Sequence, residues 1–350
     1  YPQTRVVGSA SGPLLEWLET SVFPEEARFV DPAHAGAVAA EFIEACLSRG
    51  TTTAGIYSSS DLGAAVVLFE ALAESGLRAV AGPALMDRAC PEALSVELPR
   101  AMESLATLRA RYHGAADGRL QLAVVPRFAL SCTRPLLEAA SAFASEHGLT
   151  VMTHISEHPR EGIETLEVHP YAKDYLGVYE AVGLVGPRTV LAHAIHLSDD
   201  EWGRVAQASA KIAHCPDSNA FLGSGRMHLG APRSRGVDVG LGSDVAAGRS
   251  FDLRRAISHA YDNALALRVQ VELEELFALA TLGGARVLGL AGEVGSLEVG
   301  KQADFAVLRR PSWAEGRAGA LRIASFAADF APVLRSYVQG VERWRAPNLA

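Results

Sequence analysis

The feature that most constrains the fold is an alternation of short apolar segments with longer helical ones. Seven β-branched or apolar stretches, near residues 52, 80, 122, 151, 190, 211 and 238, predict strands, and helical periodicity follows each of them. This rhythm predicts an α/β protein with a parallel sheet, and polar residues at the carboxyl ends of the strands favour a (β/α)8 TIM-like barrel. An open doubly wound sheet alternates in the same way, so the strands alone leave both architectures possible.

The C-terminal tail does not follow this rhythm. Turn glycines separate short strand-like pieces in Gly292–Val307, and Tyr337–Trp344 predicts a hairpin around Gln339-Gly340. We therefore expect a (β/α) barrel domain over residues 1–290 and the C-terminal part of a small β domain over residues 291–350. The other strands of the small domain would come from the N-terminal side.

The composition narrows the classes of partner. The chain has 350 residues, 49% of them hydrophobic, and a formal net charge of -8, without a basic run that would meet phosphates, which argues against nucleic acid. No apolar run has the length of a membrane span, and no signal peptide is visible. The sequence contains four cysteines without paired spacing, namely Cys46, Cys90, Cys132 and Cys215. Such spacing is typical of reduced intracellular proteins, so we expect a cytoplasmic location.

The segment V-M-T-H-I-S-E (151–157) carries the first chemical signal. Strand alternation places Met152 and His154 on the same face, with Glu157 just past the strand end. A histidine that holds a cation, beside a carboxylate that moves protons, is what a metal-activated water requires. On its own, however, such a pair is more often a structural hydrogen bond.

Three later strands end in the same way, each with a potential metal ligand. These ligands are His193, His214 and Asp244, and barrel strands deliver such side chains to one mouth. Two imidazoles and a carboxylate suit Zn²⁺ or Fe²⁺. Each residue also has a structural interpretation: a bond to a backbone carbonyl for His193 or His196, support of the mouth for His214, and a helix cap for Asp244. Their coincidence at matching strand ends favours the metal site.

A recognisable set of segments contains these residues: T-H-I-S-E (153–157), A-H-A-I-H-L-S (192–198), H-C-P-D-S-N-A-F-L-G-S-G (214–225) and G-L-G-S-D-V (240–245). This set resembles the amidohydrolase superfamily and, within it, the guanine deaminases. Further matches extend the resemblance over nearly the whole chain in one register. Two of them are fairly specific to guanine deaminases, namely F-P-E-E-A-R-F (23–29) and V-P-R-F (125–128).

The resemblance implies roles for individual residues. His154 and Asp244 match metal ligands, and His193 matches either a further ligand or the histidine that contacts the metal-bound water. Glu157 matches the proton shuttle, and Asp244 would help to deprotonate the water. The implied cofactor is zinc, with iron possible.

A closed barrel needs eight strands, and the sequence contains seven. The chain begins Y-P-Q-T-R-V-V without a methionine, so we expect the first barrel strand to lie before Tyr1. The family carries a His-x-His pair on that strand, followed closely by a glutamine that Gln3 matches. We therefore expect the first barrel strand and the His-x-His pair to be absent together, because both would lie before Tyr1.

The resemblance also implies the substrate. Arg127 matches a residue that donates to a purine carbonyl, Phe128 offers an aromatic face, and Gln3 would bond another edge of the ring. Trp17 would line the pocket, although an ordinary core position suits it equally. The implied reaction is the hydrolytic deamination of guanine to xanthine and ammonia, in a protein that is a homodimer like many of its family.

Two other functions stay open. Another aminohydrolase of the superfamily would act on an adenosine-like, cytosine or triazine ring, and a metal-free scaffold would perform no chemistry. Arg127 favours guanine, because a planar guanidinium suits a ring carbonyl that adenine lacks. Four departures from the family pattern leave the predicted ligands untouched: Y-S-S-S-D (57–61) in place of a His-containing run, His158, Asp217 and Ala246-Ala247.

Overall fold

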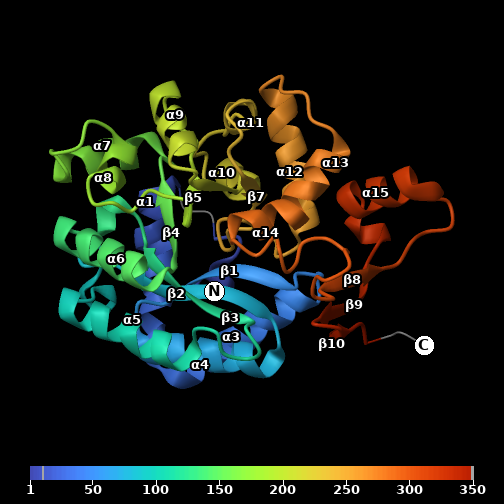
Figure 1. Cartoon of the computed structure of the whole chain (residues 1–350), viewed down its shortest axis with the longest axis horizontal. Helices are drawn as coiled ribbons and strands as arrows, with labels where there is room; N and C mark the ends of the chain where they lie inside the picture. The colour runs from blue at the N-terminus through green and yellow to red at the C-terminus, as the bar shows by residue number, and fades with distance from the viewer. Residues whose placement is uncertain (10–11, 348–350) are drawn as a thin grey trace.

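A curled, seven-stranded sheet forms the centre of the computed structural model, which describes residues 1–9 and 12–347 (Figure 1). Its strands hydrogen-bond in chain order, and every neighbouring pair is parallel. All seven predicted strands are present. They are β1 (Thr53–Ser58), β2 (Arg78–Leu85), β3 (Leu120–Pro126), β4 (Thr150–Ile155), β5 (Thr189–His193), β6 (Lys211–His214) and β7 (Val239–Leu241).

Helices cover the outer face of the sheet, and local signals set their ends. Asp31 caps α3 by accepting the N–H of Ala33, and left-handed glycines end α4 and α6. Ser198 and Glu201 form a reciprocal capping box at the start of α9. The principal outer helices are α3 (Pro32–Leu47), α4 (Leu62–Ser75), α5 (Leu98–Tyr112), α6 (Arg134–His147), α9 (Asp199–Gln207) and α12 (Leu253–Ala266).

Several helices in the described part of the chain are not evident from sequence periodicity, and the three longest are α7 (Pro159–Val168), α10 (Pro216–Phe221) and α15 (Gly316–Phe326). The first is capped by the side chain of His158, an unusual capping residue. The second is too short to show a periodic pattern, and the third lies in the tail. The His158 departure noted above therefore has a structural role at a helix start.

The two faces of the sheet bury different clusters. Met152 lies with Val80, Val125 and Val190 on the inner face, whereas Val151 packs with the large cluster beneath the outer helices. The expected alternation in β4 is therefore confirmed. Within residues 1–9 and 12–347 the sheet stays open, with β1 and β7 as its edge strands, so the expected eighth strand has no counterpart there.

The tail forms a separate three-stranded antiparallel sheet, at the right in Figure 1. Its strands are β8 (Phe305–Leu308), β9 (Val333–Val338) and β10 (Val341–Arg345). The predicted hairpin is confirmed: Gln339 and Gly340 have φ of 52° and 75°, as a tight turn between twisted strands requires. Arg78 and Asp304 join this sheet to the start of β2 through an Nε–Oδ2 contact of 3.0 Å.

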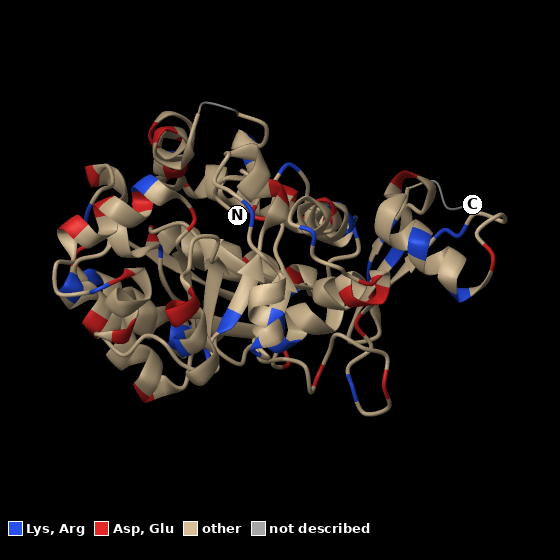
Figure 2. Ribbon diagram, turned by 90° about the horizontal axis from the view of Figure 1, so that it is seen from above, with Lys and Arg blue, Asp and Glu red and all other residues tan. Residues whose placement is uncertain are grey.

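Charged residues of both signs are distributed over the outer helices, while the central strands are mostly uncharged (Figure 2). In the parts of the chain that the structure describes, no helix has the length and apolar character needed to cross a bilayer.

Candidate active site

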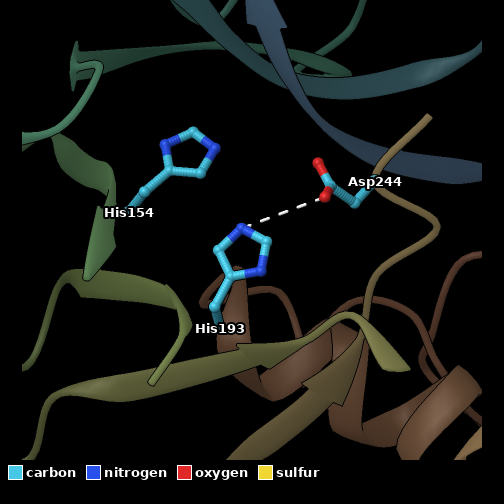
Figure 3. Close-up of side chains that lie close together, drawn as sticks. All are labelled: His154, His193 and Asp244. Atoms are coloured by element: carbon cyan, nitrogen blue, oxygen red, sulfur yellow. Dashed lines mark ion pairs between the residues drawn. The ribbon is translucent and has the colours of Figure 1, made fainter. Parts of the chain in front are cut away.

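His154, His193 and Asp244 converge at the carboxyl end of the sheet. The potential ligand atoms of the three residues all lie within 4.8 Å of one another. Figure 3 shows the two imidazole rings and the carboxylate around one space, with His193 Nε2 3.9 Å from Asp244 Oδ2. The residues come from the ends of β4 and β5 and from the turn after β7, as parallel strands dictate.

His154 is oriented by the main chain of the neighbouring strand. Its Nδ1 lies 2.6 Å from the carbonyl oxygen of Arg127, so the Nδ1–H donates and Nε2 carries the lone pair. Burial, followed by the proximity of His193, lowers the pKa of His154 to about 3. The ring is therefore neutral at physiological pH, as a metal ligand must be.

The two ring nitrogens of His193 differ in their hydrogen bonding. Its Nδ1 lies 2.8 Å from Asn219 Oδ1, whereas its buried Nε2 makes no hydrogen bond among the described residues. Burial alone would lower the pKa of His193, but the carboxylates of Glu157 and Asp244 and the bond to Asn219 raise it overall. The surroundings of Nε2 therefore attract a positive charge.

Glu157 lies beside this nitrogen, with Oε2 3.3 Å from His193 Nε2. The other oxygen of Glu157 accepts a long hydrogen bond from Ser224 Oγ at 3.4 Å. The backbone N–H of Glu157 donates to Glu161 Oε2 at 3.0 Å. Burial, and then the charge of Asp244, raise the pKa of Glu157 to about 7, while His193 opposes the shift. A carboxyl group with that pKa can both accept and return a proton at neutral pH.

The backbone around the cluster is strained. Ser156, His193, Ala194 and Asp244 have positive φ angles of 47°, 70°, 50° and 46°. Such conformations cost on the order of 1–3 kcal/mol each in non-glycine residues and gather at functional sites. Asp244 does not cap a helix, because Asp252 caps the helix that follows it. The structural interpretation of Asp244 as a cap is therefore wrong.

The other two histidines considered above are not members of this group of possible ligands. His196 Nε2 contacts the carbonyl oxygen of Ser224 at 2.8 Å, so the expected bond to a backbone carbonyl is present, although His196 is exposed rather than buried. His214 is fully buried, and neither of its ring nitrogens has a hydrogen-bond partner within the described residues. Burial lowers the pKa of His214 to about 3, so its ring is neutral.

A cavity of about 740 Å³ connects the cluster with all four residues predicted to bind substrate. These are Gln3, Trp17, Arg127 and Phe128, and Glu157 lines the same cavity. Trp17 is only 3% exposed and packs with Phe128, so it is both a core residue and part of the lining. The lining continues along β1 and β7 to Phe305 in the small sheet.

Two residues of this site have no assigned role in the sequence analysis. Glu26 lines the cavity and forms a two-pronged ion pair with Arg127, with Nη1–Oε2 at 2.6 Å and Nη2–Oε1 at 3.1 Å. Asn219 orients His193 from the short helix α10. Both occur in segments that carry the family resemblance, F-P-E-E-A-R-F and H-C-P-D-S-N, which is the signal that could have identified them.

One departure from the family pattern, Asp217, contacts the segment that carries another. Asp217 is buried and accepts hydrogen bonds from the N–H and the Nε–H of Arg249, at 2.8 and 2.9 Å. Arg249 follows Ala246-Ala247, so this pair ties down the loop that leaves Asp244. The acidic residue at position 217 therefore anchors the segment in which alanines replace the family's glycines.

A parallel β/α sheet with two histidines and an aspartate at its mouth defines a class of hydrolases that typically use a metal. The chain belongs to the amidohydrolase family, whose model matches residues 1–337. The "Probable guanine deaminase" of Deinococcus radiodurans is 41% identical to it, over 88% of this chain and 71% of the relative.

Solved structures agree with this placement. The E. coli guanine deaminase superimposes with a TM-score of 0.94 at 33% identity, covering 99% of this chain and 82% of the other. The guanine deaminase of C. acetobutylicum, solved with guanine bound in its active site, superimposes with a TM-score of 0.92 at 28% identity, covering 97% and 83%. The predicted barrel-type fold and family membership are thereby confirmed.

Proposed function

We propose that this protein catalyses the hydrolytic deamination of guanine to xanthine and ammonia. The observation that carries the proposal is one cavity lined by the His154–His193–Asp244 cluster, Glu157 and Arg127. The relatives named as guanine deaminases support the substrate class, as does the neighbour that holds guanine. Another aminated ring as substrate, or a metal-free scaffold, has no comparable support.

The donor set fits a divalent cation, and we infer zinc, with iron as the alternative. His154 Nε2, His193 Nε2 and the Asp244 carboxylate would hold the ion, because both imidazole Nδ1 atoms are already engaged and His193 Nε2 is buried without a hydrogen-bond partner among the described residues. A bound divalent cation supplies Lewis acidity, which lets water act as a nucleophile near neutral pH.

Glu157 is assigned the proton transfers. In the overall reaction the oxygen of water bonds to C2 of guanine, the bond from C2 to the exocyclic nitrogen breaks, and ammonia leaves. Glu157 accepts one proton from the water and delivers it to a ring nitrogen; it then accepts the second proton from the hydroxyl formed on C2 and delivers it to the departing amine, so that C2 becomes a carbonyl. A carboxyl group with a pKa of about 7 permits both transfers. His193 Nε2 either holds the ion, as above, or carries a proton and donates to the attacking oxygen; one nitrogen does not do both.

Ammonia release by the natural full-length protein tests the proposal, with guanine, adenine, cytosine and melamine as substrates and metal analysis in parallel. We expect guanine to be turned over fastest by a protein that contains stoichiometric zinc or iron. Turnover of another ring but not guanine, or a protein without stoichiometric metal, would overturn the proposal. The homodimer that the resemblance implies belongs to the same proposal, and sedimentation of the purified protein tests it.

A further inference from the structure

Among the described residues, the Arg127 guanidinium is hydrogen-bonded at one edge only, and its Cζ lies over the Phe23 ring, 5.4 Å from the centroid. Nη1 and Nη2 both donate to the Glu26 carboxylate, and Nη1 also lies 3.8 Å from Met86 Sδ. Both members of the ion pair are nearly buried, with exposed fractions of 6% for Arg127 and 4% for Glu26. The main chain of Arg127 is fixed as well, because its N–H donates to Leu85 and its carbonyl accepts from His154.

A guanidinium has five N–H donors in one plane, arranged as an end edge (Nη1 and Nη2) and a side edge (Nε and Nη2). Glu26 occupies the end edge of Arg127. Among the described residues, Arg127 Nε makes no hydrogen bond. Nε is also not fully enclosed, since it is absent from the buried atoms that lack a partner, and Arg127 lines the cavity. The side edge therefore offers two parallel donors to whatever enters the cavity.

Gln3 is fixed by the same carboxylate. Its Nε2 donates to Glu26 Oε1 at 3.0 Å, and its Oε1 accepts from the N–H of Ala246 at 3.5 Å. Glu26 thus determines the orientation of two of the side chains expected to contact the substrate. Because its charge compensates that of Arg127, the pair adds no net charge to the wall of the cavity.

We propose that Glu26 is a positioning residue that sets substrate specificity: it directs the side edge of Arg127 at the O6 and N7 atoms of an oxopurine. These two acceptors are adjacent on guanine, and arginine commonly reads them with a bidentate contact. Adenine presents an amine donor beside N7, so it would oppose one of the two N–H groups. This inference rests on the proposed function. It adds that the O6 and N7 edge of the purine is recognised, and that Glu26 orients the arginine that recognises it.

The first test compares guanine with 7-deazaguanine, in which a C–H group replaces N7, on the natural full-length protein. We expect kcat/KM for 7-deazaguanine to be lower by about 10- to 100-fold, the value of one good bidentate contact. The loss should fall mainly on KM, because the contact is remote from C2 and persists through the reaction.

The second test repeats this comparison in Glu26→Gln, which is expected to reduce the discrimination between the two purines to a few-fold. Glu25→Gln is the matched control, because Glu25 is also buried but pairs with His34 and Arg28 and does not line the cavity. Thermal melts of both variants establish that they are folded. The control should discriminate between the purines as the natural protein does.

Three results would count against these expectations. Equal kcat/KM for guanine and 7-deazaguanine in the natural protein overturns the inference while leaving guanine deamination intact. Undiminished discrimination in folded Glu26→Gln overturns the positioning role of Glu26. Absence of ammonia release from guanine overturns the proposed function, and the inference fails with it.

Discussion

The two ends of the central sheet use buried polar groups differently. At the amino end, the Arg78–Asp304 pair is almost fully enclosed and ties β2 to the C-terminal sheet, and Ser336 Oγ donates to the carbonyl oxygen of Leu47. At the carboxyl end, His193 Nε2 has no hydrogen-bond partner among the described residues, and the backbone around it is strained. The buried Arg78–Asp304 pair at the amino end joins two parts of the chain, whereas His193 Nε2 at the carboxyl end is placed where it can bind a ligand.

This contrast predicts separable effects. A substitution at the carboxyl end should change chemistry with little effect on stability, and one at the amino end should do the reverse. The following substitutions test that separation, in decreasing order of expected effect.

Glu157→Gln should have the largest effect. We expect guanine turnover to fall by about 10²- to 10⁴-fold, the usual contribution of a positioned acid–base group, with metal content and melting temperature unchanged. Glu201→Gln is the control, since Glu201 is a buried capping glutamate of α9 that does not line the cavity. Ammonia release, metal analysis and thermal melts provide the measurements. Near-normal turnover in Glu157→Gln would remove Glu157 from the proton transfers and weaken the contrast between the two ends.

Arg78→Met tests the amino end. The substitution leaves the buried Asp304 carboxylate without its main partner, so we expect a loss of about 3–5 kcal/mol in unfolding free energy and an unchanged kcat for the folded protein. Arg111→Met breaks the exposed Arg111–Glu70 pair and should cost less than about 1 kcal/mol. Denaturant unfolding measures both variants. A similar, small loss in each would show that the Arg78 pair does not hold the tail.

Asn219→Ala, at the carboxyl end, should have a smaller effect than either of these. Removing the acceptor for His193 Nδ1–H frees the ring to adopt the other tautomer, and we expect metal affinity to fall by about 10- to 100-fold. Chelator competition measures the affinity independently of turnover. Asn219→Asp keeps an acceptor at the same place and should restore most of the affinity. Equal affinities in the alanine variant and the natural protein would mean that Asn219 only packs beside the ring.

The parts of the fold and site that the sequence predicts are those set by local pattern. Period-two alternation fixes the face of Met152 and His154, and strand order brings His193 and Asp244 to the same end. These relations need only the strands and the rule that parallel strands end together.

The parts that sequence reasoning misses depend on tertiary contacts. Glu26 and Arg127 are 101 positions apart, and no local pattern links them. Asn219 belongs to a six-residue helix that follows directly on a strand and shows no periodicity. The left-handed backbone at His193 and Asp244 lies outside what residue preferences indicate, because neither residue is a glycine. In each case the surrounding structure outweighs the local signal.

His214 gives the smallest expected effect at neutral pH and a pH dependence that separates it from the cluster. Burial lowers its pKa from 6.5 to about 3, so the unfolded chain binds a proton that the folded protein does not, and stability falls as pH drops from 6.5 toward 3. At pH 5 this penalty is about 2 kcal/mol. His214→Leu removes the titrating group, and because neither ring nitrogen has a hydrogen-bond partner among the described residues, it should change stability by less than about 1 kcal/mol at pH 8. Denaturant unfolding at both pH values measures the difference: parallel losses of stability in the variant and the natural protein between pH 8 and pH 5 would show that His214 does not contribute to acid sensitivity.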